Sequence, residues 1–123
     1  MAERARSGTW VAKGIHKTTW AGLTQATLDT GAPTKYHRLA DKNVTVRGTY
    51  GVGGSVTLEG SNDLTDPPTN WYTLQDVAGN AIALTAANPT EQILQNMLWY
   101  RPRVTAGDGT TSLACEIVAV GKD

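Results

Sequence analysis

Alternating hydrophobic and polar residues predict β-strands, and the pattern is clearest in residues 44–74. In residues 44–47 the two valines fall on one face of an extended chain, and the threonine and arginine fall on the other. Residues 55–59 repeat this alternation, which places Thr57 and Glu59 opposite the valine and the leucine. A period of two is typical of a strand with one buried and one solvent-facing side. Two strands are therefore predicted here, with Thr57 and Glu59 facing water.

Turn-forming residues separate these strands. Residues 48–54 contain four glycines, and glycine readily adopts the positive φ that tight turns need. Residues 60–63 end the second strand, and a polar loop with Pro67-Pro68 follows before residues 71–74 resume the strand pattern. We therefore expect the order strand, turn, strand, loop, strand.

Strand patterns continue on both sides of this segment. Further strands are predicted at residues 10–16 (interrupted at Gly14), 18–23 (a continuation or a new strand), 27–33 (running into a turn), 35–39, 81–85 (with Ile82 and Leu84 inward), 98–105 and 112–120. Residues 90–97 are short and lie among strands, so a strand or a single turn is favoured over a helix.

Two features of the C-terminal third predict local geometry. Pro102 has no backbone N–H to donate, which predicts that residues 98–105 lie at a sheet edge or carry a bulge at Pro102. The sequence Gly-Asp-Gly at residues 107–109 predicts a hairpin turn. Residues 112–120 carry hydrophobic side chains on both faces apart from Glu116, so this strand is expected to be buried on both sides.

Eight to ten short strands, with turn signals about every 8–12 residues, predict an all-β fold, an antiparallel β-sandwich of jelly-roll type. The chain has 123 residues, which is expected to give one domain with one core. We assign residues 10–123 to this domain. Residues 1–9 lack a strand pattern and are predicted to be a flexible N-terminal arm, either a disordered terminus or a segment that orders on a neighbouring subunit.

Charge and cysteine content limit the partners and the compartment. Eleven basic and eleven acidic residues give a formal net charge of zero, whereas nucleic-acid binders need a basic excess. The first residues lack the apolar core of a signal peptide, and no stretch approaches the ~20 apolar residues of a membrane helix. The single cysteine, Cys115, excludes an internal disulfide and favours a reducing cytoplasm. We therefore expect no nucleic-acid or membrane partner.

The residues that commonly carry chemistry are isolated from one another. Cys115 lies between apolar neighbours in a predicted strand, so it is expected to be a buried hydrophobe. His16 and His37 have no ligand residue at zinc spacing, and Asp63 and Asp66 lack the alternating pattern of a calcium loop and are interpreted as turn formers. The sequence therefore predicts no enzyme, no metal and no cofactor.

Surface residues remain as candidates for binding another protein. Trp99, Arg101 and Arg103 share one face of a predicted strand, and Trp and Arg often anchor interfaces. The alternative is that Trp99 packs in a second core layer while the arginines extend their charged ends to water. The candidate capsid or subunit interface comprises Arg4, Arg6, Trp10, Trp99, Arg101 and Arg103.

Four segments carry a resemblance to a known family. They are Val56–Asp63 followed by Trp71, residues 76–82, residues 100–105 and the turn at residues 107–111. Together they resemble the small head decoration (cement) proteins of tailed bacteriophages, across roughly residues 40–120. The resemblance implies a jelly roll on the capsid exterior that clamps the major capsid protein, often as a dimer or trimer, without catalysis, and that is made in the host bacterial cytoplasm. Residues 63–68 depart from the shorter, glycine-rich loop that the family leads us to expect.

Two other functions fit the same sequence. A carbohydrate-binding β-sandwich stacks sugar rings on exposed aromatic side chains, so Trp20, Trp71 or Trp99 would have to face solvent. Another virion part, such as a tail or neck protein, would differ from a decoration protein in having far fewer copies per particle.

Overall fold

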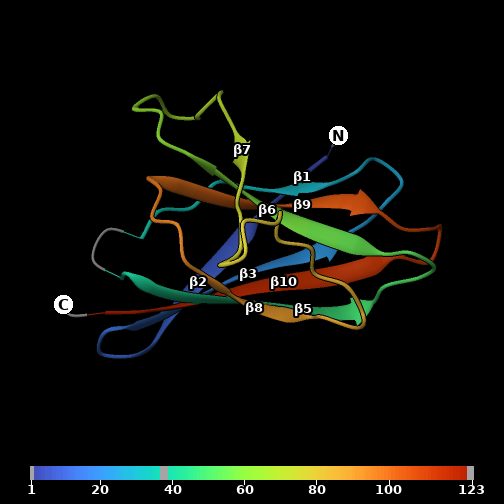
Figure 1. Cartoon of the computed structure of the whole chain (residues 1–123), viewed down its shortest axis with the longest axis horizontal. Coiled ribbons are helices and arrows are strands. Elements are labelled where there is room, and N and C mark those ends of the chain that lie inside the picture. Colours follow the sequence, from blue (N-terminus) through green and yellow to red (C-terminus); the bar gives the residue numbers. More distant parts are fainter. Residues whose placement is uncertain (1, 37–38, 122–123) are drawn as a thin grey trace.

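The computed structural model describes residues 2–36 and 39–121, and these form ten strands in two sheets stacked face to face (Figure 1). The strands are β1 (Glu3–Arg4), β2 (Arg6–Ala12), β3 (Ile15–Leu23), β4 (Thr30–Gly31), β5 (Asp41–Thr49), β6 (Ser55–Ser61), β7 (Tyr72–Thr73), β8 (Thr90–Ile93), β9 (Trp99–Ala106) and β10 (Ser112–Val120). No helix occurs within the described ranges. The predicted all-β sandwich of eight to ten short strands is confirmed.

The strand order is that of a jelly roll. One sheet has the order β1-β4-β9-β6-β7 and the other has the order β2-β3-β10-β5-β8. From β3 onward every connection passes from one sheet to the other except that between β6 and β7. Strand pairs are antiparallel apart from β1 and β4. The eight strands β3–β10 therefore form the double-sheet arrangement of a jelly roll.

The core lies between the two sheets and follows the alternation of the strands. Val44 and Val46 of β5 are buried, and so are Val56 and Leu58 of β6, as predicted. Trp20 of β3 is completely buried and donates from its indole Nε1 to the Ala32 carbonyl oxygen at 2.9 Å. The strand pattern of the sequence therefore identified the buried face of the central strands.

The prediction that Thr57 and Glu59 face water was wrong. Both side chains point to the outer face of β6, yet both residues are buried. The Thr57 hydroxyl donates to the Ile82 carbonyl oxygen at 2.6 Å, and Glu59 lies between two arginines of β9. Long side chains and a neighbouring segment cover the outer face of this sheet, so β6 is buried on both sides.

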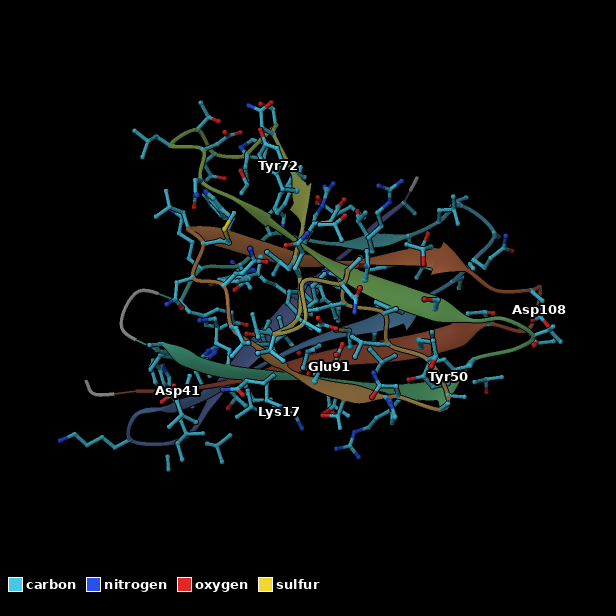
Figure 2. All side chains as sticks on the ribbon, in the orientation of Figure 1. Lys17, Asp41, Tyr50, Tyr72, Glu91 and Asp108 are labelled. Carbon is cyan, nitrogen blue, oxygen red and sulfur yellow. The ribbon has the colours of Figure 1, made fainter. Side chains whose placement is uncertain are left out.

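Turns at one end of the sandwich carry the chain between the sheets (Figure 2). The glycine turn is confirmed, with Gly51 and Gly53 at φ +69. The prediction of a hairpin at residues 107–109 was wrong, because β9 and β10 lie in different sheets. Asp108 joins the two turns by accepting the Val52 N–H at 2.8 Å. Hydrogen bonds from the Thr110 side chain, from Val52 and from the Thr110 backbone lower the pKa of Asp108 to about 2.

Pro102 lies in neither of the predicted settings. Strand β9 is interior, between β4 and β6, and the bulge in its pairing lies near the start of β6. Tyr100 exchanges two backbone hydrogen bonds with Thr34, and Val104 donates a third across the same side. Pro102 lies between Tyr100 and Val104 and packs against Gly31. Any larger residue at position 31 would place its Cβ only 2.6 Å from the proline ring. A short partner strand and a glycine therefore leave room for a proline that donates no bond.

The N-terminal residues differ from the predicted flexible arm. Glu3–Arg4 form β1, and residues from Arg6 onward form β2. Gly14, predicted to interrupt one strand, lies at φ +77 in the turn between β2 and β3. The residue pattern did not predict these strands, because β1 and β2 are held by backbone pairing at sheet edges, with no buried alternating side chains in β2.

Three other strand predictions need correction or refinement. Lys35 and Tyr36 lie outside the strands, and residues 37 and 38, including His37, lie outside the described ranges. Residues 81–85 form only isolated bridges, although Ile82 and Leu84 point inward as predicted. Strand β10 is buried on one face only, and Val120 on the other face is exposed. Residues 90–93 form a strand, as favoured.

Candidate functional site

The loop between β6 and β7 projects beyond the rest of the sandwich in Figure 1. We call residues 62–71 the braced loop, because side chains on β6 and β9 hold it in place. Trp99 of β9 is buried, and its indole Nε1 donates to the Asp63 carbonyl oxygen at 3.0 Å. The Lys35 ammonium lies 4.1 Å from the centre of the Trp99 ring. Trp99 is therefore buried rather than solvent-facing, and its hydrogen bond to Asp63 supports the loop.

A buried carboxylate fixes the other support. Glu59 is only 5% exposed and accepts a hydrogen bond from Arg101 Nε at 2.8 Å, while Arg103 Nη1 lies 3.3 Å from its second oxygen. The Arg101 guanidinium lies over the Trp71 ring, with Cζ 4.1 Å from the ring centre. Because Trp71 ends the braced loop, the chain of contacts from Glu59 through Arg101 fixes the loop on the sheet.

Asp63 orders the loop from within. One carboxylate oxygen, Oδ2, accepts the backbone N–H groups of Thr69 and Asn70, each at 2.8 Å. Those two backbone donors lower the pKa of the Asp63 carboxyl group. This arrangement fits the interpretation of Asp63 as a turn former. The two ends of the loop are therefore drawn together by one carboxylate.

The braced loop carries an exposed apolar side chain. Leu64 is 95% exposed, and Tyr72 at the start of β7 is also exposed (Figure 2). A hollow of about 580 Å³ beside the loop is lined by Arg6, Trp99, Asp66 and others. Two predicted interface residues, Arg6 and Trp99, therefore border the same hollow although 93 positions separate them in the sequence.

Of the predicted N-terminal interface residues, Arg4 lies on β1, and Arg6 and Trp10 lie on β2. Arg4 Nε pairs with the buried carboxylate of Asp29 at 2.8 Å. Arg6 Nε donates to the Pro33 carbonyl oxygen at 3.0 Å. Trp10 is 60% exposed, and its ring contacts the edge of His16 with centroids 4.9 Å apart. Of the six predicted residues, Trp10 is therefore the one large apolar side chain that lies open to solvent.

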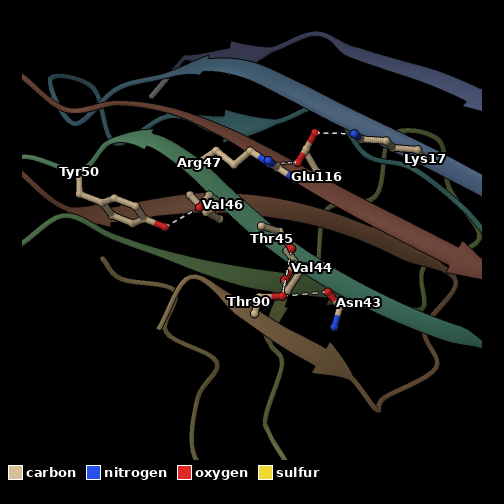
Figure 3. A network of polar contacts seen from close by, with 9 residues as sticks. All are labelled: Lys17, Asn43, Val44, Thr45, Val46, Arg47, Tyr50, Thr90 and Glu116. Carbon is tan, nitrogen blue, oxygen red and sulfur yellow. Dashed lines mark hydrogen bonds and ion pairs between the residues drawn. The ribbon is translucent and has the colours of Figure 1, made fainter. Parts of the chain in front are cut away.

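The outer face of the second sheet carries polar residues that bond to one another (Figure 3). Glu116 of β10 lies between Lys17 and Arg47, at 2.7 and 2.5 Å. Beside them the Thr90 hydroxyl donates to Asn43 Oδ1 at 3.0 Å. As at Glu59, a carboxylate here lies between two cations. Arg47 is 69% exposed, however, so its ion pair with Glu116 is open to water.

Within residues 2–36 and 39–121, no three His, Cys, Asp or Glu side chains are placed to hold a metal ion. Cys115 is buried as predicted, and burial raises the pKa of its thiol. The same ranges contain no helix with the length and apolar character of a membrane span.

Comparison with known proteins gave no relative. The chain matches no protein-family model, and neither a curated protein nor a solved structure matches it significantly. The function therefore has to be argued from the site itself.

Sequence reasoning missed two residues that organise this site. The strand alternation predicted that Glu59 faces water, and no local signal marked it as buried, because both of its arginine partners lie on β9. Leu64 is a lone leucine in a polar loop, which the pattern did not single out. The carbohydrate hypothesis is weakened, because Trp20 and Trp99 are buried and Arg101 covers a face of Trp71.

Proposed function

We propose that this protein is a structural component of a tailed-phage virion that binds the outside of the capsid and stabilises the lattice of the major capsid protein. The braced loop is its main contact in this proposal. The observation that carries it is the 95% exposure of Leu64 on a loop whose conformation is already fixed by its own hydrogen bonds. The resemblance of four segments to head decoration proteins supports the choice of partner.

A preformed loop favours binding for two physical reasons. Ordering a flexible segment costs free energy on association, and a loop ordered beforehand avoids that cost. Burying one leucine side chain contributes about 1.5–3 kcal/mol. A contact of this size is sufficient when it is repeated over a lattice, and a protein that binds only one state of the lattice stabilises that state by mass action.

The first test is sedimentation of capsid particles with the wild-type protein and with Leu64→Asp. The proposal predicts that the wild type co-sediments at high copy number per particle. The Leu64→Asp variant is expected to bind about 10-fold more weakly or worse, because it loses the leucine contact and places a charge in the interface. Its thermal unfolding should match that of the wild type, since Leu64 makes no core contact.

Val77→Asp is the matched control. Val77 is 88% exposed on a different loop, so this variant makes the same change of charge and loses a similar apolar surface. It should bind like the wild type. Equal binding by Leu64→Asp and the wild type would reject the braced loop as the contact, and a wild type bound at only a few copies per particle would favour a tail or neck protein instead.

A further inference from the structure

Strand β2 is unusual among the edge strands of this protein. All seven of its residues are exposed, and it pairs with β3 on one side only. The other three edge strands have two residues in β1 and β7 and four in β8. Short edge strands are a common protection against pairing with another chain. β2 therefore presents the one long open edge within the described ranges.

Apart from the charge of Arg6 and the irregularity after Trp10, β2 lacks the other usual protections of an edge strand. Residues 6–10 contain no proline and no lysine, and their pairing with β3 is regular. The irregularity in this ladder lies between Trp10 and Ala12. An exposed strand with open N–H and C=O groups is a template for a further strand. The regular stretch from Arg6 to Trp10 is thus available for backbone pairing.

The side chains of this stretch are complementary to themselves. We propose that β2 pairs antiparallel with β2 of a second copy, about a two-fold axis at Gly8, to form a symmetric dimer. Arg6 then lies opposite Trp10 of the second copy, and Ser7 lies opposite Thr9. Residues directly opposite have Cβ atoms about 4.5–5.5 Å apart, so each arginine reaches a tryptophan face for a cation–π contact. No like charges oppose one another.

The two faces of β2 fit this register. Trp10 contacts His16 on the face toward the first sheet, and Gly8 lies on the same face, where an added Cβ would meet the His16 ring at 2.9 Å. Ser7 and Thr9 point to the opposite face, where Thr9 lies beside Lys17. The dimer joins the β2 sheets of two copies into one continuous sheet. It stands independently of the proposed capsid function, although two copies of each loop would strengthen binding to a lattice.

A charge exchange tests both the surface and the register. In the Ser7→Lys, Thr9→Lys double variant, two lysine pairs oppose one another across the axis. In the Ser7→Glu, Thr9→Lys double variant, the same positions form two opposite-charge pairs. Sedimentation velocity over a concentration series should show the wild type and the Glu/Lys variant as dimers of twice 13.1 kDa. The Lys/Lys variant should dissociate at about 10-fold higher concentration than the Glu/Lys variant.

Circular dichroism checks that all three proteins are folded. Both variants should fold, because residues 7 and 9 are exposed. A wild type that remains monomeric at every concentration would overturn the dimer. Dimers of equal strength in both variants would place the interface elsewhere, and equal loss in both would overturn the register. Capsid binding by a monomeric wild type would leave the capsid proposal standing while rejecting this one.

Discussion

Replacing Glu59 by glutamine is expected to lower the free energy of unfolding by about 3 kcal/mol and to loosen the braced loop. Removing one partner of a buried ion pair costs about 3–5 kcal/mol, because it leaves the other charge unpaired. We expect the lower end because Arg103 is 40% exposed and partly screened by water. Urea denaturation gives the change in stability, and amide hydrogen exchange over residues 62–71 reports on the loop.

Glu116→Gln is the matched control for this prediction. Glu116 also lies between two cations, on the outer face of the other sheet (Figure 3). Its nearest partner, Arg47, is 69% exposed, whereas Arg101, the nearest partner of Glu59, is 15% exposed. Surface pairs of this kind contribute about 0–1 kcal/mol, so a small loss and an unchanged braced loop are expected. Equal losses in the two variants, or a loop that exchanges no faster in Glu59→Gln, would show that Glu59 does not fix the loop.

Glu59 and its strand show what the sequence could and could not predict. The inward faces of β5 and β6 were predictable because alternation is a local property, and a strand with two valines on one side buries that side. The burial of Glu59 was not, because the arginines that enclose it lie 42 and 44 positions further along the chain. Local pattern sets which face is apolar, and distant partners decide whether a polar face is also covered.

The turn signals in the sequence could not show which sheet each strand joins. Glycine and aspartate at residues 107–109 mark a reversal of the chain, but they do not distinguish a hairpin from a connection that crosses between sheets. The crossing here depends on β10 pairing with β3 and β5, which lie far away in the sequence. β2 was missed for a related reason, since its pairing uses backbone groups and leaves no alternation of buried side chains.

The candidate site was predicted in its parts but not in its arrangement. Trp99, Arg101 and Arg103 were correctly placed on one face of one strand. The structure shows that Trp99 and Arg101 serve as supports, while the surface that they hold outward belongs to a loop more than thirty positions earlier, at Asp63 and Leu64. Residue type therefore indicated where strong contacts form, and only the fold showed whether those contacts are internal or available to a partner.

Asp29 is the second residue on which a large effect is expected. Its carboxylate is completely buried and accepts hydrogen bonds from the Thr27 hydroxyl, from the backbone and hydroxyl of Thr24, and from Arg4 Nε. Burial alone raises the pKa of this carboxyl group. The hydrogen bonds more than offset burial, and the pKa falls from 3.8 to about 2. Asp29 thus ties β1 to the turn before β4.

A depressed pKa makes the contribution of Asp29 dependent on pH. A shift of this size corresponds to about 2 kcal/mol of stability, which is present above pH 3.8 and is lost as the pH falls toward 2. Asp29→Asn should therefore be less stable than the wild type by at least about 2 kcal/mol at pH 7, and the difference should shrink by about that amount between pH 5 and pH 2. Urea denaturation at each pH measures this difference in stability.

Asp66→Asn, at an exposed carboxylate, is the control and should follow the wild type throughout. If the difference in the free energy of unfolding between Asp29→Asn and the wild type stays constant across this range, the charge of Asp29 does not stabilise the fold. The difference can change with pH only if the ionised carboxylate stabilises the folded protein more than the protonated carboxyl group does.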